Sequence, residues 1–207
     1  MSKTKKPRET GRKFTTVEAR LVEAVAPDPG KPQARIVAAV GKLGDQPELR
    51  TISAIVAAAG LLTADRRLLR AGVRMLLAHE LATLAKDIVK KRVNRTRPRS
   101  ATTHRERKVK PGRSTAKEET SFPSGHSAGA FAVARAFARD YPEHQAAALV
   151  AAGLVAGAQV PRLAHYPTDV AAGIVLGVAS EAVVGLILGP VEDGATPEAP
   201  PRPRPRA

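Results

Sequence analysis

The sequence predicts an all-α fold, a helical bundle with unstructured ends, and three observations carry this prediction. Alanine, leucine, valine and glycine dominate the 207 residues, whereas aromatic residues make up 3% and tryptophan is absent. Such a composition favours close-packed helices over a sheet. Apolar residues recur at helical spacing from Glu48 to Val93. Prolines and glycines separate the other apolar segments, and the length allows one domain with a substantial core.

The first 44 residues divide into a tail and two short helices. Residues 1–14 are strongly basic and are expected to be disordered, either simply solvated or lying against anionic lipid. Residues 15–44 contain two amphipathic segments, 15–26 and 31–43, with three prolines and Gly30 between them. The main domain is therefore expected to span residues 45–189.

Two helices and a loop are expected in the first half of this domain. The first helix breaks near Gly60 and Asp65. The second runs from Ala71 to Val93, and its apolar residues recur at helical spacing: they are Val73, Leu76, Leu77, Leu81, Leu84 and Ile88. A polar, strongly basic loop follows over 98–121.

Three more helices, 124–140, 146–159 and 167–189, precede a Pro-rich tail, 190–207, that is expected to be disordered. Val170–Gly189 is the best membrane candidate, because its 20 residues contain one charge, Glu181, and can cross a hydrocarbon core of about 30 Å. Its glycines, spaced four apart, allow close helix packing. A membrane-embedded bundle is favoured over a soluble bundle, in which this helix would simply be buried, provided that the charges elsewhere line a polar site.

The charge and the missing cysteines limit the classes of function. A net charge of +15 predicts an anionic partner. Zinc-finger spacing and an aromatic-rich RNA-binding pattern are both absent, so specific nucleic-acid binding is not expected. Without cysteine there is no disulfide, thiolate metal site or cysteine nucleophile. The charged N-terminus lacks the apolar stretch of a signal peptide, so secretion by that route is not expected.

Three short motifs carry candidate chemistry. Lys90 and Arg97-Pro98 are seven residues apart, nearly two helical turns, so both cations can project from one face and grip a phosphoryl group. Pro123-Ser124-Gly125-His126 resembles a helix start, with Ser124 as N-cap, Gly125 open to a close-lying ligand and His126 as a proton donor or acceptor. Taken alone, the second motif is better explained as a capping segment with an incidental histidine.

The third motif is His165-Tyr166-Pro167-Thr168-Asp169. Proline is tolerated in a first turn, so a helix should begin near Pro167. Asp169 then lies within reach of one nitrogen of His165, where a carboxylate fixes the tautomer and leaves the other nitrogen free to attack. The alternative is a first-turn aspartate that only complements the helix dipole.

Together the three motifs resemble the signature of the type 2 phosphatidic acid phosphatase (PAP2) and vanadium haloperoxidase superfamily. The resemblance implies an all-helical bundle in which His165 attacks phosphorus, Asp169 supports His165 and His126 protonates the leaving oxygen. Lys90, Arg97, Ser124 and Gly125 would hold the phosphate, and neither a metal nor another cofactor is implied. The family's third motif opens with Ser-Arg, where this chain has Ala158 and Gln159. Arg162, three residues before His165, is the expected substitute.

The resemblance favours a metal-independent lipid phosphatase, a multi-pass protein of a bacterial-type cell membrane, acting on a phosphomonoester or a diphosphate. A soluble acid phosphatase or a vanadate-dependent haloperoxidase is the alternative, although the missing signal peptide and the short chain disfavour them. A non-enzymatic basic protein that binds anionic membranes or nucleic acid explains the charge but not the motifs. The basic loop favours the cytoplasmic face for the site, whereas similar lipid phosphatases often act on the outer face.

Overall fold

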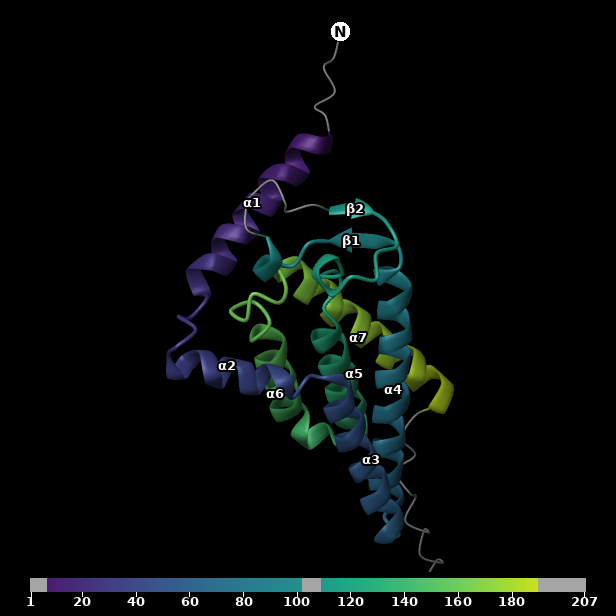
Figure 1. Cartoon of the computed structure of the whole chain (residues 1–207). Helices are drawn as coiled ribbons and strands as arrows, with labels where there is room; N and C mark the ends of the chain where they lie inside the picture. The colour runs from purple at the N-terminus through teal and green to yellow at the C-terminus, as the bar shows by residue number, and fades with distance from the viewer. Residues whose placement is uncertain (1–6, 102–108, 190–207) are drawn as a thin grey trace, which may run out of the picture.

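The computed structural model describes residues 7–101 and 109–189, and most of them are helical. Two helices, α1 and α2, lie along one side of a bundle formed by α3 to α7 (Figure 1). The all-α prediction is confirmed. The bounds are α1 Pro7–Val25, α2 Pro32–Lys42, α3 Gln46–Leu62, α4 Arg66–Lys90, α5 Gly125–Asp140, α6 Gln145–Gly157 and α7 Pro167–Leu188.

α5 is the central helix and packs against α3, α4, α6 and α7. Its contact with α7 requires glycine, because a Cβ at Gly173 would lie 2.4 Å from the Ser124 carbonyl oxygen. A Cβ at Gly177 would lie 2.2 Å from the carbonyl oxygen of Ala128. The predicted close approach at these two glycines is confirmed, and it brings the starts of α5 and α7 together.

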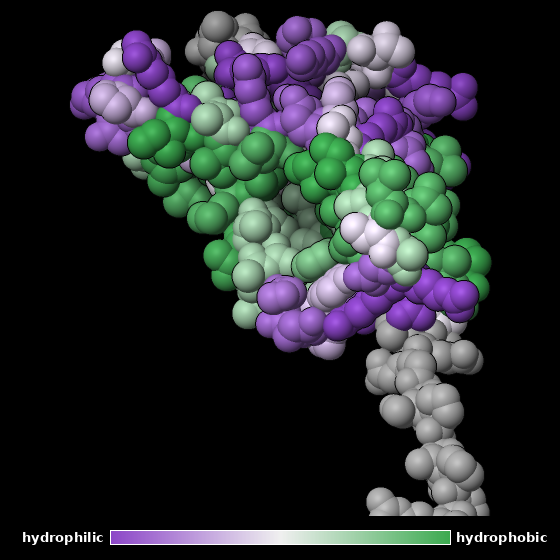
Figure 2. Space-filling model, turned by 90° about the horizontal axis from the view of Figure 1, so that it is seen from below, coloured by the Kyte–Doolittle hydropathy of each residue, from purple (hydrophilic) through white to green (hydrophobic). Residues whose placement is uncertain are grey.

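The interior of the bundle is built mainly from small side chains. Its largest core cluster contains five alanines and only a few larger residues: Leu49, Met75, Ala78, Ala82, Ala128, Ala132, Val133, Ala136 and Val184. The larger apolar side chains lie on the outside instead. Figure 2 shows them as a hydrophobic band across one face, between hydrophilic margins. This distribution is the reverse of the usual one in a soluble domain.

α4 shows the reversal most clearly. Four of the six apolar residues predicted for this helix face outward, and Leu84 is 59% exposed; the four are Val73, Leu77, Leu84 and Ile88. The face turned to the bundle carries Met75, Ala78 and Ala82. Among the described residues, one helix, α7, is long and apolar enough to cross a membrane by length and composition.

A short irregular region covers the end of the bundle where α4 stops. β1 (Val93–Arg95) and β2 (Val109–Pro111) pair antiparallel, with Val93 opposite Pro111. Two 3-10 turns, η1 (Pro98–Ser100) and η2 (Lys117–Glu119), complete it, and a third, η3 (Pro142–His144), joins α5 to α6 at the opposite end. The small sheet lies at the edge of the expected 98–121 loop, which the sequence gives no strand signal for.

Ion pairs gather at the opposite end of the bundle. Arg70 Nε lies 2.7 Å from Asp140 Oδ1, and the fully buried Arg74 pairs with the other oxygen at 3.0 Å. Arg139 Nε donates to Glu181 Oε1 at 2.5 Å. We call Arg70, Arg74, Arg139, Asp140 and Glu181 the far-end ion pairs. Each buried carboxylate there is matched by arginine.

Several boundaries differ from those expected. α1 begins at Pro7, so part of the predicted N-terminal tail is helical, whereas residues 1–6 lie outside the described residues. α3 continues past Gly60 to Leu62, and α4 starts at Arg66, where Asp65 caps it by accepting from the Leu68 amide. The break therefore lies within the predicted region, but the helix starts before the expected Ala71 because Asp65 caps it. The expected C-terminal tail, 190–207, also lies outside the described residues.

Candidate active site

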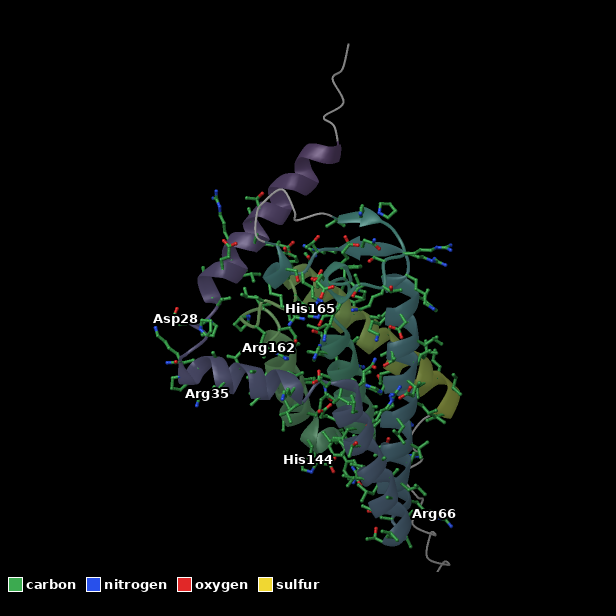
Figure 3. The ribbon with its side chains drawn as sticks, in the orientation of Figure 1. Asp28, Arg35, Arg66, His144, Arg162 and His165 are labelled. Carbon is green, nitrogen blue, oxygen red and sulfur yellow. The ribbon has the colours of Figure 1, made fainter. Side chains whose placement is uncertain are left out.

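A cavity of about 420 Å³ lies where α4 ends and α3 and α5 begin. Five of the predicted site residues, from separate motifs, line it together: Lys90, Arg97, Gly125, His126 and His165. The other lining residues are Gly44, Asp45, Gln46, Pro47, Glu48, Lys86 and Lys117. Figure 3 shows His165 at this end, with His144 and Arg66 at the opposite end. The cavity therefore combines cations with the first turns of two helices, an arrangement that suits an anion.

His165 is almost fully buried and its ring is fixed by a backbone contact. Nδ1 lies 2.7 Å from the Ser121 carbonyl oxygen, which can only accept, so Nδ1 carries the proton and donates. Burial, followed by the positive charges of Arg97 and Lys90, lowers the pKa of His165 to about 4, while Asp169 opposes the shift. At neutral pH the ring is therefore uncharged, with the lone pair of Nε2 available as a nucleophile.

Asp169 is placed differently from the simplest expectation. Its Oδ2 lies 3.7 Å from Nδ1 of His165, within ion-pair range but beyond a hydrogen bond. That oxygen accepts instead from the Ser121 hydroxyl and the Tyr166 amide, while Oδ1 accepts from Arg95. Asp169 thus secures the first turn of α7 and the segment that holds Ser121, and its influence on His165 is electrostatic.

Lys90 and Arg97 are held by neutral acceptors. Lys90 Nζ donates to the Thr120 carbonyl at 2.8 Å. Arg97 donates to the carbonyl oxygens of Lys117 and Ala164, and its Nη1 lies 3.4 Å from His165 Nε2. Carbonyl oxygens fix the two side chains without cancelling their charge. The positive charge beside the nucleophilic nitrogen therefore remains available to a phosphate.

The Pro123–His126 segment enters α5 as predicted. Ser124 is the N-cap, and its hydroxyl accepts from the Ser127 amide at 3.3 Å. That hydroxyl is fully buried and is not among the groups lining the cavity, so its contact with phosphate stays a prediction. Gly125 leaves room for Lys86, whose Cδ would lie 2.8 Å from an added Cβ. His126 faces His165 with 6.2 Å between the ring centres.

Arg162 lies beside the cavity rather than in its lining. Its guanidinium contacts Gln159 Oε1 at 3.4 Å and passes over Gly41, whose added Cβ would lie 2.1 Å from Nη1. Gln159 is fully buried, and its carbonyl oxygen accepts from the amides of Ala164 and His165. Gln159 thus shapes the turn that carries His165. The suggestion that Arg162 replaces the family's arginine stays a prediction.

Sequence reasoning missed four residues around the site. Asp45 contacts His126, and the Ser121 carbonyl holds His165. Arg95 and Glu18, both buried, lie behind Asp169: Glu18 accepts from Arg95 Nη2 at 2.6 Å and from the Thr168 amide at 2.9 Å. Asp45 had a local signal, since aspartate before Gln46-Pro47 marks a helix start. The others depend on contacts between distant segments.

The chemistry of this cavity is that of an anion site with a nucleophile. No group of three or more histidine, aspartate or glutamate side chains in the described part of the chain is arranged to hold a metal ion. The cavity instead offers a neutral imidazole nitrogen, two fixed cations and a second histidine on its far side. These groups can bind a phosphoryl group, attack it and supply a proton to the group that leaves.

A family model described as the PAP2 superfamily matches residues 71–189, more than half of the chain, and this span holds every predicted site residue. The chain belongs to the PAP2 superfamily. The match to this family supports a phosphoric ester hydrolase. Its fold is similar to the crystal structure of a transmembrane PAP2-type phosphatidylglycerolphosphate phosphatase from Bacillus subtilis, with 21% identity, a TM-score of 0.60 and coverage of 84% of this chain and 85% of that one. A search of curated proteins returned no match.

Proposed function

We propose that this PAP2 protein is a membrane-embedded lipid phosphatase that works through a phosphohistidine at His165. One observation carries the proposal. The unprotonated Nε2 of a buried histidine lies 3.4 Å from Arg97, in a cavity whose cations Lys90 and Arg97 are held by carbonyl oxygens rather than by carboxylates. Such a cavity is complementary to a phosphate that is being attacked by Nε2.

The surface supports a membrane location. Small residues fill the interior, and large apolar side chains lie outside on α3, α4, α6 and α7. Water disfavours such a surface, whereas lipid accommodates it, and small interior residues are typical of helices that pack within a bilayer. The cavity lies where α4 ends, beyond the exposed Leu84 and Ile88 of that helix, so we infer that a lipid phosphate enters it while the chains stay in the hydrocarbon.

The first step transfers the phosphoryl group to the enzyme. Nε2 of His165 forms a bond to phosphorus, and the bond from phosphorus to the ester oxygen breaks. Its electron pair stays on the leaving oxygen, which takes a proton from His126. Lys90 and Arg97 stabilise the charge that develops on the other phosphate oxygens. The Nδ1–H of His165 remains bound to the Ser121 carbonyl, which shares the positive charge that forms on the ring.

The second step releases phosphate. Water attacks phosphorus while His126, now neutral, accepts its proton, and the bond between phosphorus and Nε2 breaks. Inorganic phosphate leaves, and both histidines return to their starting states. The buried Asp169, 3.7 Å from Nδ1, favours the charged phosphohistidine that exists between the two steps.

The decisive experiment combines phosphate release with trapping of the intermediate. Protein purified in detergent is given phosphatidic acid, phosphatidylglycerol phosphate, a polyprenyl diphosphate and a water-soluble phosphomonoester, with and without EDTA. We expect release from lipid substrates, unchanged by EDTA. Quenching in base, where phosphohistidine survives, should give a phosphorylated peptide containing His165.

The matched control is a histidine at the other end of the bundle. His165→Asn should remove both phosphate release and the labelled peptide. His144→Asn, at an exposed position in η3, should change neither. Phosphate release that survives His165→Asn would remove His165 from its assigned role. Release from only the water-soluble ester would favour the soluble acid phosphatase alternative.

A further inference from the structure

The cavity is lined by carboxylates as well as by cations. Lys86, Lys90, Arg97 and Lys117 line one part, whereas Asp45 and Glu48, at the start of α3, line another. A purely cationic cavity would bind any phosphate, whatever its neighbouring group. Two carboxylates in the same cavity place negative charge beside the phosphate position, where the remainder of a substrate must lie.

Asp45 does not perform the local role that its position predicts. It occupies the N-cap of α3, where an aspartate usually accepts from an amide of the first turn. Here the side chain makes no capping bond; its Oδ1 lies 2.5 Å from Nε2 of His126 instead. The carboxylate is 39% exposed, so it lies at the accessible edge of the cavity.

We propose that Asp45 is a specificity-determining residue that directs the enzyme to phosphate esters with an uncharged alcohol as leaving group and against diphosphates. This inference rests on the proposed phosphatase function. His126 is the proton donor to the leaving oxygen, and Asp45 touches His126, so the leaving group must depart next to the Asp45 carboxylate. An alcohol meets no repulsion there. The leaving group of a diphosphate is itself a phosphate, whose negative charge Asp45 repels.

Proton donation by His126 to the leaving group also favours esters over diphosphates. An alkoxide is a strong base and leaves slowly without a proton, so an ester requires a general acid, whereas a phosphate leaving group is stable without one. A carboxylate against His126 stabilises the protonated ring that such an acid needs. Asp45 therefore assists one substrate class through His126 and opposes the other through its charge.

Glu48 adds an acceptor to the same wall. Its Oε2 is buried, and no donor among the described residues hydrogen-bonds to it. A buried acceptor without a donor is unfavourable, and a hydroxyl of a bound alcohol can supply the missing hydrogen bond. A second phosphate has no such donor when it is fully ionised. The wall therefore suits an alcohol that carries a further hydroxyl or has a bound water beside it.

The test compares two lipids with the same acyl chains. Phosphatidic acid releases an alcohol, and diacylglycerol pyrophosphate releases a phosphate monoester. We expect the wild type to have a higher kcat/KM for phosphatidic acid than for diacylglycerol pyrophosphate. Asp45→Asn should lower the ratio of kcat/KM for phosphatidic acid to kcat/KM for diacylglycerol pyrophosphate at least about tenfold. Asp45→Glu, which keeps the charge, should retain the preference. Asp28→Asn, at an exposed position between α1 and α2, should leave the ratio unchanged.

A pH profile separates this role from a structural one. Burial lowers the pKa of His126, and Asp45 opposes that shift. The other charged or titratable groups near the ring are Arg97, Arg162, His165 and Lys86. In Asp45→Asn, the fall in kcat/KM for phosphatidic acid with rising pH should move to lower pH, because the ring loses the carboxylate that retains its proton. The profile for diacylglycerol pyrophosphate should lack this shift.

Each outcome decides between the proposals. Equal losses on both lipids, with no shift of the profile, would give Asp45 a structural role and overturn the inference while leaving the phosphatase function intact. A wild-type preference for the diphosphate would also overturn it. Absence of phosphate release by the wild type from these two lipids and from the other lipid phosphates of the panel would overturn the proposed function itself.

Discussion

The cations that line the cavity and the cations at the far end of the bundle are held by opposite kinds of partner, although Arg95, buried behind the cavity, also pairs with carboxylates. At the far end, Asp140 is shared by Arg70 and Arg74, and Glu181 is paired with Arg139. At the cavity end, Lys90 and Arg97 donate to backbone carbonyl oxygens. Paired charges hold helices together, whereas charges held by neutral dipoles keep their attraction for an anion. The acceptor, more than the number of cations, distinguishes the cations that line the cavity from the arginines at the far end.

Removing a carboxylate from the far-end ion pairs should give the largest change in stability. Asp140→Asn removes the carboxylate from Arg74, which is fully buried and cannot reach water. We expect a loss of about 3–5 kcal/mol in the free energy of unfolding, because an uncompensated buried charge remains. Thermal unfolding in detergent measures this loss. Glu143→Gln, at the same end but exposed against Arg67, is the control and should leave the melting temperature unchanged.

Removing a cation from the cavity should instead lower activity. Arg97→Met should lower kcat/KM for a lipid phosphomonoester about 100- to 1,000-fold, the usual effect of losing one group that stabilises the transition state. Its melting temperature should stay much closer to wild type than that of Asp140→Asn, since no carboxylate is left unpaired. If Arg97→Met unfolds as readily as Asp140→Asn, the two ends do not differ in the way we describe.

The positive charges of Lys90 and Arg97 should also affect how the activity depends on pH, because burial and these charges lower the pKa of His165. Because the pKa of His165 is about 4, the nucleophile is lost only as the pH falls through that value, well below the 6.5 of an unperturbed histidine. We expect kcat/KM, corrected for ionisation of the substrate phosphate, to decline on the acid side near pH 4. Arg97→Met should move this decline to higher pH, because one positive charge that disfavours the imidazolium is lost. A wild-type decline near pH 6.5 would contradict the buried, neutral histidine.

Disturbing the close packing of α5 against α7 should give the smallest effect. Gly177→Ala places a methyl group 2.2 Å from the Ala128 carbonyl oxygen and must push α7 from α5. We expect a loss of about 1–3 kcal/mol in stability, as for other overpacked interiors, with a parallel fall in activity. Gly153→Ala, in α6 with no atom within 4 Å of the new methyl group, should be neutral or stabilising. Equal melting temperatures for the two variants would show that α7 moves freely there.

Local spacing explains which parts of the fold and site were predictable. Ser124 before α5 and Pro167 at the first position of α7 set the helix starts within a few residues. The three motifs contain all five predicted residues that line the cavity. Periodicity in α4 identified an apolar face without showing what lies against it. The face of Leu77 and Leu84 points outward, and the alanines of the opposite face form the core.

The missed residues share a different property. Asp45 lies 81 positions before His126, and Ser121 acts through a backbone carbonyl that every residue type possesses. A sequence pattern cannot indicate a partner that only folding brings near. The start of α4 was misplaced for a simpler reason: Asp65 was interpreted as part of a break, although its side chain caps the helix.

The bond between Glu18 and Thr168 has a consequence for how the enzyme is made. The two residues are 150 positions apart, yet Glu18 completes the first turn of the helix that follows His165. During synthesis at about 5–20 residues per second, Glu18 leaves the ribosome on the order of ten seconds before its partner. Glu18 can pair with Arg95 when the chain is about half made, but its contact with Thr168 forms only when the last helix emerges, and catalytic competence begins then.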